Sequence, residues 1–213
     1  SIPFLGLTNE GMPRFYNERG QETLGDFNFS SSNINFLKYS GTLDPTDVGT
    51  LTNTFRYKNF SLSANINYEF GAVTRLRSIS NTDDYSAFPR ELTQRWKKPG
   101  DEKHTDIPRL PTSYAFDQYG ADNLINAYYA YGASTARIVS TDFIRLKEIS
   151  MEYTVSKTLL RRTPLKNLAV KLQAQNLMLL YSDARLRGDD PEYMYSSSVT
   201  APKKLILTLR VGL

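Results

Sequence analysis

Residues 60–70 read FSLSANINYEF, and the pattern of this stretch decides the fold. Every odd-numbered residue in it is polar, whereas the even-numbered ones are Phe60, Leu62, Ala64, Ile66, Tyr68 and Phe70. Residues two apart lie on the same face of a β-strand, whereas a helical period would mix the two sets. The stretch is therefore predicted to be a β-strand with one apolar and one polar face.

The length of this strand indicates what its apolar face contacts. Residues 60–70, at about 3.3 Å each and tilted by about 45°, cover the apolar thickness of a thin outer-membrane bilayer. Strands of soluble proteins more often have about 5 to 6 residues. Phe60 at one end, with Tyr68 and Phe70 at the other, fits two interfacial rows of aromatic side chains. A long strand of a soluble β-sandwich is the alternative that this stretch leaves open.

Four further strands are predicted around it. LTNTFRY at 51–57 precedes it across a tight turn at Lys58 and Asn59, and alternation returns at 142–155 and 166–181. The chain ends on KKLILTLRVGL, in which only Ile206 interrupts the separation of Leu205, Leu207, Leu209, Val211 and Leu213 from Lys204, Thr208, Arg210 and Gly212. Because terminal residues usually fray in water, this terminal strand is expected to be paired and covered by something apolar.

The connections between these strands are alternately short and long. Residues 1–39 are predicted to be a loop with a short strand or helical turn near 34–39. The long connection at 72–140 allows short helices after Pro89 and at 122–132, and a second loop occupies 183–202. Short turns on one rim and long extracellular loops on the other predict an all-β fold, an antiparallel transmembrane β-barrel portion of about five to six strands. Since about eight strands are the minimum for a barrel and open edges are untenable in lipid, the portion needs the rest of its barrel.

Composition excludes several other classes of protein. The 26 basic and 22 acidic residues are interspersed, so the net charge of +4 does not indicate nucleic-acid binding. No run of about 18 apolar residues is present, which excludes a transmembrane helix. The absence of cysteine excludes disulfides and thiolate sites. The opening SIPFLGL lacks the regions of a signal peptide, so we expect either a removed start or a piece of a longer chain.

Several motifs, in order along the chain, resemble one family. Residues 41–71 look like the barrel hairpin of SusC/RagA-type TonB-dependent transporters of Bacteroidota outer membranes. RWKKPGDEKHTDIPR at 95–109 is similar to a loop signature of that family, and 142–176 is similar to its strand pair ending in Gln-Asn-Leu. GDDPEY at 188–193 resembles the Gly-x-Asp-Pro-Glu loop of the family, and the opening stretch at 6–20 resembles one of its extracellular loops.

The resemblance implies a fold, a location and a function. Residues 1–213 would be the C-terminal part of a TonB-dependent barrel of about 22 strands, whereas the plug domain and TonB box have no counterpart in this chain. The protein would lie in the bacterial cell outer membrane, with its C-terminus periplasmic and its long loops extracellular. It would import oligosaccharides or peptides beneath a SusD-like surface lipoprotein, with energy from the TonB complex. Leu213 stands where the family usually has a terminal Phe.

No catalytic residue is expected, and the protein is predicted not to be an enzyme. The single His104 lies in a polar, turn-rich loop without an apolar pocket or acid partner. No cofactor is expected, although Asp189, Asp190 and Glu192 leave a Ca²⁺ site open as an alternative.

Aromatic side chains of the long connection offer stacking faces and hydroxyl groups to a substrate. The predicted substrate contacts are Trp96, Tyr114, Tyr128 and Tyr129, together with Arg145 on the polar face of a strand. Packing within the loop is the alternative for each aromatic residue.

Two alternatives of other classes make distinct structural predictions. A soluble all-β carbohydrate-binding module requires Leu205, Leu207 and Leu209 to be buried against a second sheet. A secreted glycosidase fragment requires two carboxylates within about 10 Å across a cleft.

Overall fold

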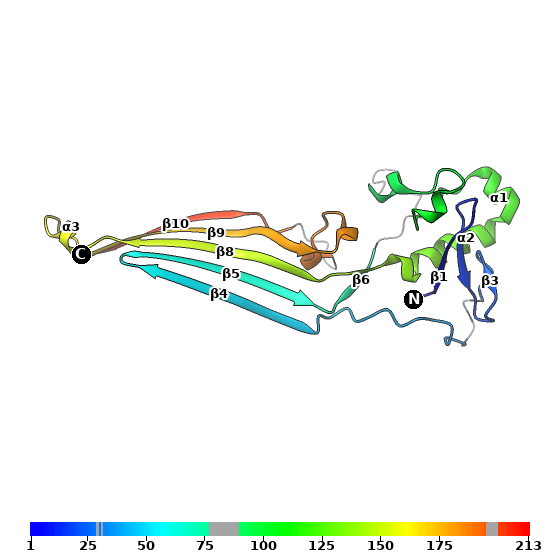
Figure 1. Ribbon diagram of the computed structural model, residues 1–213, viewed down its shortest axis with the longest axis horizontal. Coiled ribbons are helices and arrows are strands. Elements are labelled where there is room, and N and C mark those ends of the chain that lie inside the picture. Colours follow the sequence, from blue (N-terminus) through cyan, green and yellow to red (C-terminus); the bar gives the residue numbers. More distant parts are fainter. Residues whose placement is uncertain (29, 31, 77–89, 195–199) are drawn as a thin grey trace. The chain divides into compact units, whose positions relative to one another are not determined.

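Five long strands form one antiparallel sheet in the order β10-β9-β8-β5-β4 (Figure 1). The structure, a computed structural model, describes all residues except 29, 31, 77–89 and 195–199. The strands are β4 (Asp47–Tyr57), β5 (Phe60–Phe70), β8 (Phe143–Thr154), β9 (Asn167–Ser182) and β10 (Lys204–Gly212). All five predicted strands are therefore confirmed. Within the described residues the sheet is open, with β4 and β10 at its edges.

A β-bulge in β8 keeps its apolar residues on one face. Asn65 pairs with Glu148 and Ile66 with Leu146, which leaves Lys147 as an extra residue in β8. On both sides of the bulge, the apolar residues of β8 from Ile144 to Tyr153 pair with even-numbered residues of β5, all apolar or small. The same face of β8 therefore carries Ile144, Leu146, Ile149, Met151 and Tyr153.

β9 contains a matching irregularity at Asn176. Glu148 pairs with Gln175 but Leu146 pairs with Met178, so β9 has one more residue than β8 in this interval. Asn176 adopts φ +54°, a left-handed conformation that Asn tolerates better than most residues. Its side-chain Nδ2 donates to the carbonyl oxygen of Pro202, at 3.2 Å, just before β10 begins.

The five-stranded sheet belongs to a compact unit of residues 42–74 and 140–213, which also contains short helical segments. α3 (Lys157–Leu160) lies in the β8–β9 connection, and η4 (Ala184–Leu186) and η5 (Pro191–Tyr193) lie between β9 and β10. β6 (Val73–Arg75) and β7 (Ile138–Ser140) form a separate two-stranded sheet. None of the helices in the described residues has the length and apolar character needed to cross a bilayer.

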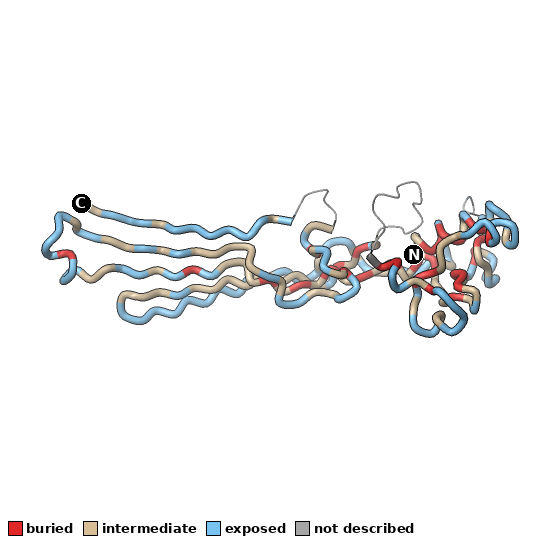
Figure 2. Tube along the Cα trace, turned by 90° about the horizontal axis from the view of Figure 1, so that it is seen from above, coloured by how far each residue is buried: buried red, intermediate tan, exposed pale blue. Residues whose placement is uncertain are grey.

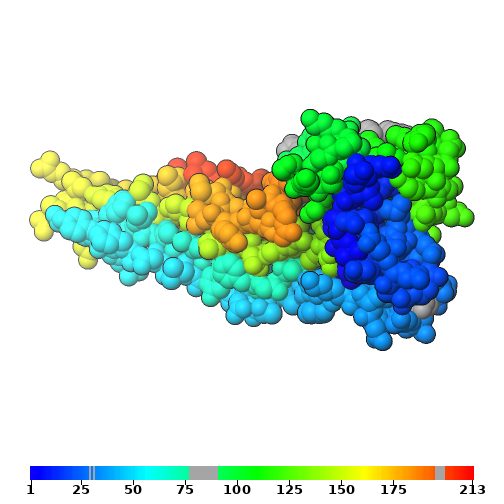
Figure 3. Space-filling view, turned by 45° about the vertical axis from the view of Figure 1, so that its right-hand side comes forward, coloured from blue at the N-terminus to red at the C-terminus, as the bar shows by residue number. Residues whose placement is uncertain are grey.

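Residues 1–41 and 75–139 form a second compact unit. It holds a three-stranded sheet of β1 (Phe4–Leu7), β2 (Pro13–Tyr16) and β3 (Glu22–Thr23), and two helices, α1 (Ser113–Tyr119) and α2 (Ala121–Gly132). The 3-10 turns η1 (Arg90–Gln94), η2 (Asp101–Lys103) and η3 (Thr135–Arg137) complete it. In Figure 3 the N-terminal strands, in blue, lie beside the green helical segment of this unit.

Two hydrophobic clusters hold the second unit together. One contains Ile2, Phe15, Leu92, Ile107, Ala130 and Tyr131, and the other contains Met12, Ala115, Leu124 and Tyr128. Beside the first cluster, the Arg137 guanidinium donates two hydrogen bonds of 2.7 Å to the buried Glu91 carboxylate. Both clusters join the N-terminal segment to residues about a hundred positions away along the chain. One face of α2 is therefore buried by contacts that a local sequence pattern does not predict.

The prediction of a loop at residues 1–39 was wrong for its first part. β1, β2 and β3 lie there, whereas residues 34–39 hold only a turn and no strand or helix. These strands have 4, 4 and 2 residues, too few for an alternating pattern to emerge. The helix predicted at 122–132 is confirmed as α2, and a 3-10 turn, η1, follows Pro89, which itself lies outside the described residues. α1 was not predicted.

Candidate functional site

One face of the five-stranded sheet is apolar across all five strands, with Asn53 in β4 as a polar exception between the two ends. The register places one residue of each strand in a row: Leu207, Leu172, Met151, Leu62 and Phe55. The adjacent row consists of Leu209, Val170, Tyr153, Phe60 and Tyr57. Most of these side chains are exposed, Leu207 by 71%. Figure 2 shows the pale blue of exposed residues along these strands. An exposed apolar surface of this extent indicates a contact surface for lipid or for another protein.

The opposite face is polar. Between the two apolar rows, the strands turn the following residues to the opposite face: Arg56, Ser61, Glu152, Lys171 and Thr208. Side chains of this face bond across the strands, with 3.1 Å between the Thr54 and Ser63 hydroxyls and 3.1 Å from Gln175 Nε2 to Glu148 Oε2. Ile206 is the apolar exception that the terminal sequence indicated in β10, and Val48, Phe143 and Leu179 are apolar residues of this face in other strands. A sheet with these two faces suits a boundary between an apolar and an aqueous phase.

Aromatic side chains mark both ends of the apolar face. Tyr57, Phe60 and Tyr153 form a row at the turn end, whereas Tyr68 and Tyr181 flank Ile144 in a row at the other end. From Phe60 to Tyr68, eight residues along β5 at about 3.3 Å each make about 26 Å, or about 20 Å normal to a membrane at a tilt of about 40°. This is close to the apolar band of about 25 Å in outer-membrane barrels.

The soluble-module alternative is not favoured by this geometry. Leu205, Leu207 and Leu209 are all exposed, and no second sheet covers them within the described residues. The burial that this alternative requires is therefore not observed.

Arg145 fastens the GDDPEY segment to the polar face of β8. Its Nη2 donates to Asp190 Oδ1, its Nε lies 3.0 Å from Glu192 Oε2, and Lys147 Nζ lies 2.9 Å from Glu192 Oε1. Asp190 also accepts the backbone N–H of Glu192. These acids thus neutralise cations of the chain, and Asp189 is exposed. The part of the chain that is described contains no acid or histidine cluster suited to a metal ion, so the Ca²⁺ alternative gains no support.

Two of the predicted substrate contacts are used inside the second unit. Trp96 is buried, its ring lies against Gly11, and its Nε1 donates to Glu102 Oε2 at 3.2 Å. The buried Tyr128 hydroxyl donates to the carbonyl oxygen of Arg109, and burial raises the pKa of Tyr128 above its ordinary value. Their packing is that of core residues.

The other two predicted aromatic contacts are accessible. Tyr114 on α1 is 68% exposed and Tyr129 on α2 is 63% exposed. Arg145 is buried under its two acidic partners. His104, which was not expected to act in catalysis, is exposed at the end of η2. Substrate contact therefore stays a prediction, and Tyr114 and Tyr129 are the residues that a ligand reaches most directly.

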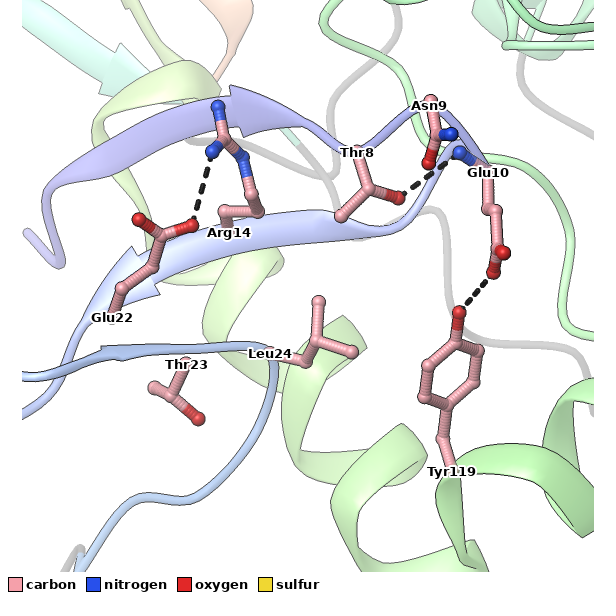
Figure 4. A pocket seen from close by; sticks show the side chains of 8 residues that line it. All are labelled: Thr8, Asn9, Glu10, Arg14, Glu22, Thr23, Leu24 and Tyr119. Carbon is pink, nitrogen blue, oxygen red and sulfur yellow. Dashed lines mark hydrogen bonds and ion pairs between the residues drawn. The ribbon is translucent and has the colours of Figure 1, made fainter.

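A cavity of about 370 Å³ lies in the second unit between β2, β3 and α1 (Figure 4). Its lining residues are Thr8, Asn9, Glu10, Arg14, Glu22, Thr23, Leu24 and Tyr119. The Tyr119 hydroxyl donates to Glu10, while Arg14 Nη1 lies 3.0 Å from Glu22 Oε1. Burial, with the hydrogen bond to the Glu10 carboxylate, raises the pKa of Tyr119 to about 12. Sequence reasoning missed this cavity, because its walls come from segments that are far apart in the chain.

Neither a protein-family model nor a curated protein matches the sequence. Solved structures do match it. A chain of the RagAB peptide importer in the "open-open" state aligns with a TM-score of 0.64 and 17% identity, over 100% of this chain and 22% of that chain. A chain of the RagAB peptide transporter gives 0.59 and 20%, over 90% and 19%. The RagAB importer in the "closed-closed" state gives 0.58 and 19%, over 90% and 20%.

These matches establish the fold. The present chain spans about a fifth of the length of the matched chains. The likeness to SusC/RagA proteins that the motifs indicated is thereby confirmed at the level of the fold.

Proposed function

We propose that the chain is a C-terminal wall segment of an outer-membrane importer of the SusC/RagA type. Its five strands would contribute to a barrel of about 22 strands, closed by strands that pair with β4 and β10. The observation that carries the proposal is the continuous, exposed apolar face between two aromatic rows, opposite a polar face. Hydrocarbon on one side and an aqueous lumen on the other account for both faces.

The proposed activity is energised uptake without covalent chemistry. Peptides are the favoured cargo because the matched structures are those of a peptide importer, and oligosaccharides are the competing class. The TonB complex would supply the energy and a SusD-like surface lipoprotein would close over the loops. Long loops would be extracellular and the short turns periplasmic. Tyr114 and Tyr129 are proposed to contact the cargo.

Two adjacent residues of β10 provide a matched test of lipid contact. Leu207 on the apolar face is 71% exposed, whereas Ile206 on the polar face is 37% exposed. In water, Leu207→Arg at so exposed a position would be harmless. Facing lipid, it should cost about 2–4 kcal/mol, whereas Ile206→Arg should be tolerated in a polar lumen. Heat-modifiable migration of the full-length protein in detergent gels, with outer-membrane fractionation, measures both variants.

The opposite ranking would contradict the proposal. A full-length protein that stays soluble without detergent, with Leu207→Arg unaffected, would exclude a lipid-facing sheet. The cargo class is a separate question, which uptake of labelled peptides and oligosaccharides by cells producing the protein answers. Tyr114→Ala and Tyr129→Ala should lower uptake of the true cargo while leaving heat-modifiable migration unchanged.

A further inference from the structure

The short connections at one end of the five-stranded sheet are basic and contain no acid. Lys58 lies in the β4–β5 turn, and Lys157, Arg161, Arg162 and Lys166 lie in the β8–β9 connection. Residues 56–60 and 155–167 contain no Asp or Glu. These five residues, here called the basic rim, therefore carry a formal charge of +5 that nothing in the two connections offsets.

Backbone hydrogen bonds hold both connections at this end of the sheet, since one links the β4–β5 turn to the end of β8 and the other links the β8–β9 connection to the end of β10. The Thr154 N–H donates to the carbonyl oxygen of Asn59 at 2.9 Å, and the Lys166 N–H donates to that of Gly212 at 2.8 Å. Figure 3 shows the cyan β4–β5 turn and the yellow β8–β9 connection at the same end of the sheet. All five rim residues are exposed, and within the described residues none forms an ion pair with a carboxylate.

The rim lies next to the aromatic boundary of the apolar face. Tyr57 and Phe60, of the aromatic row at this end, flank the turn that carries Lys58, and Lys58 Nζ lies 5.2 Å from the centre of the Tyr57 ring. Leu159 on α3 is exposed within the same basic segment. Aromatic rows of this kind lie at headgroup level. Residues one step further along the strands are therefore at the height of the phosphates, with Leu159 available to the acyl boundary.

We propose that the basic rim binds the anionic phospholipid headgroups of the leaflet at the short-turn end. Clusters of four to eight Lys and Arg beside a membrane-embedded segment favour anionic lipids, with about 1 kcal/mol per residue. Arg161 and Arg162 can each bind a phosphate in bidentate fashion. The other end of the same sheet carries acids together with cations, Asp47, Glu69, Asp142 and Asp183 beside Lys203 and Lys204, so connections that are basic and free of acid are found at the rim end. The inference rests on the proposed insertion into a membrane.

The test compares anionic with zwitterionic lipid bound by the full-length protein. Protein is extracted from nanodiscs of phosphatidylethanolamine and phosphatidylglycerol, and native mass spectrometry counts the lipids retained. The test variant is K157Q/R161Q/R162Q/K166Q. The control variant K38Q/K97Q/K98Q/K103Q removes the same number of exposed cations from the second unit. Wild type and control should be enriched in phosphatidylglycerol, and the rim variant should lose about fivefold in affinity per charge removed. About 0.5 M NaCl should weaken the wild-type enrichment.

Three outcomes would overturn the inference. These are a rim variant that retains phosphatidylglycerol like wild type, a control that loses it equally, or an inserted wild type without lipid preference, whether or not it retains an acidic protein. Heat-modifiable migration is recorded for each variant, and K157Q/K166Q, with about half the effect, replaces a quadruple variant that does not fold. A wild type that does not insert at all contradicts the proposed function, whereas an inserted wild type without lipid preference contradicts only the rim.

Discussion

At Gly11, backbone conformation and side-chain packing both exclude a Cβ atom. Gly11 adopts φ +76°, and a Cβ built on it would lie 2.4 Å from the Trp96 ring. Gly20 has a similar φ of +73° with no atom within 4 Å of its Cβ position. A comparison of Gly11 with Gly20 therefore separates the cost of backbone strain from the cost of a steric clash. The clash explains why the residue that faces the buried Trp96 ring is a glycine.

Gly11→Ala should destabilise the second unit more than Gly20→Ala. Both substitutions place a side chain in the left-handed region at about 1–2 kcal/mol, but Gly11→Ala also forces the Trp96 ring to move at about 1–3 kcal/mol. Urea unfolding of the 213-residue chain in detergent, followed by emission of its single Trp, measures the difference. Equal losses for the two variants would show that the Trp96 ring yields without cost.

The hydrogen bond between Tyr119 and Glu10 should make the second unit sensitive to alkaline pH. Folding raises the pKa of Tyr119 from 10.0 to about 12, so the bond stabilises fully below pH 10 and its contribution is lost as pH rises toward 12. Tyr119→Phe should therefore cost about 1 kcal/mol at neutral pH, since the pair is only partly buried, and nothing at pH 12. The same urea measurement at several pH values tests this. With Glu10→Gln the loss should still begin near pH 10 but end at a lower pH, because Glu10 raises only the folded-state pKa of Tyr119, and an unchanged profile would contradict the role of Glu10.

At the scale of elements, the bulges of β8 and β9 decide which side chains face outward. If β8 ran past Lys147 without the bulge, regular alternation from Ile149 would turn Ile144 and Leu146 to the polar face, because one residue of slip inverts every side chain. The irregularity of β9 at Asn176 lies beside the bulge of β8, between the pairs Glu148–Gln175 and Leu146–Met178. Both bulges therefore preserve the continuity of the apolar face.

Asn176→Val should disturb this register, whereas Asn176→Gly should not. A β-branched residue is strained at φ +54° by about 1–2 kcal/mol or more. Glycine relieves the strain and loses only the bond from Asn176 Nδ2 to Pro202. The temperature at which the full-length protein changes its gel migration should fall for the Val variant and stay near wild type for the Gly variant. The reverse order would mean that the side-chain bond, not the conformation, matters.

At the scale of the whole molecule, the described sheet has two unpaired edge strands and an exposed apolar face. Such edges and patches promote aggregation in water. The 213-residue chain expressed by itself should therefore aggregate in aqueous buffer and become monodisperse in detergent, as seen by light scattering. Leu205→Lys/Leu207→Lys/Leu209→Lys should increase its solubility without detergent, in contrast to the loss of membrane assembly expected in the full-length protein. A wild-type chain that is monodisperse in water would contradict a lipid-facing role.

Much of the candidate site was predictable in the sheet and little of it in the second unit. The apolar faces of β5 and β10 and the polar position of Ile206 follow from alternation, which neighbouring residues determine by themselves. Trp96 and Tyr128 were predicted to contact substrate, but their burial depends on Gly11 and Arg109 and so on the fold of distant segments. The sequence around an aromatic residue in a loop does not distinguish an exposed side chain from a packed one.

The sequence by itself determined the number of long strands and most of their faces, because a strand with one apolar and one polar face alternates residue by residue. Only the tertiary structure decided where β1, β2, β3 and α1 form, which loop aromatics stay accessible, and that Asp190 and Glu192 neutralise Arg145 and Lys147. Those features rest on contacts such as Tyr119 with Glu10, which are 109 residues apart. Contacts between such distant residues produce no periodic pattern in the sequence from which they could be predicted, because the two partners come together only when the chain folds.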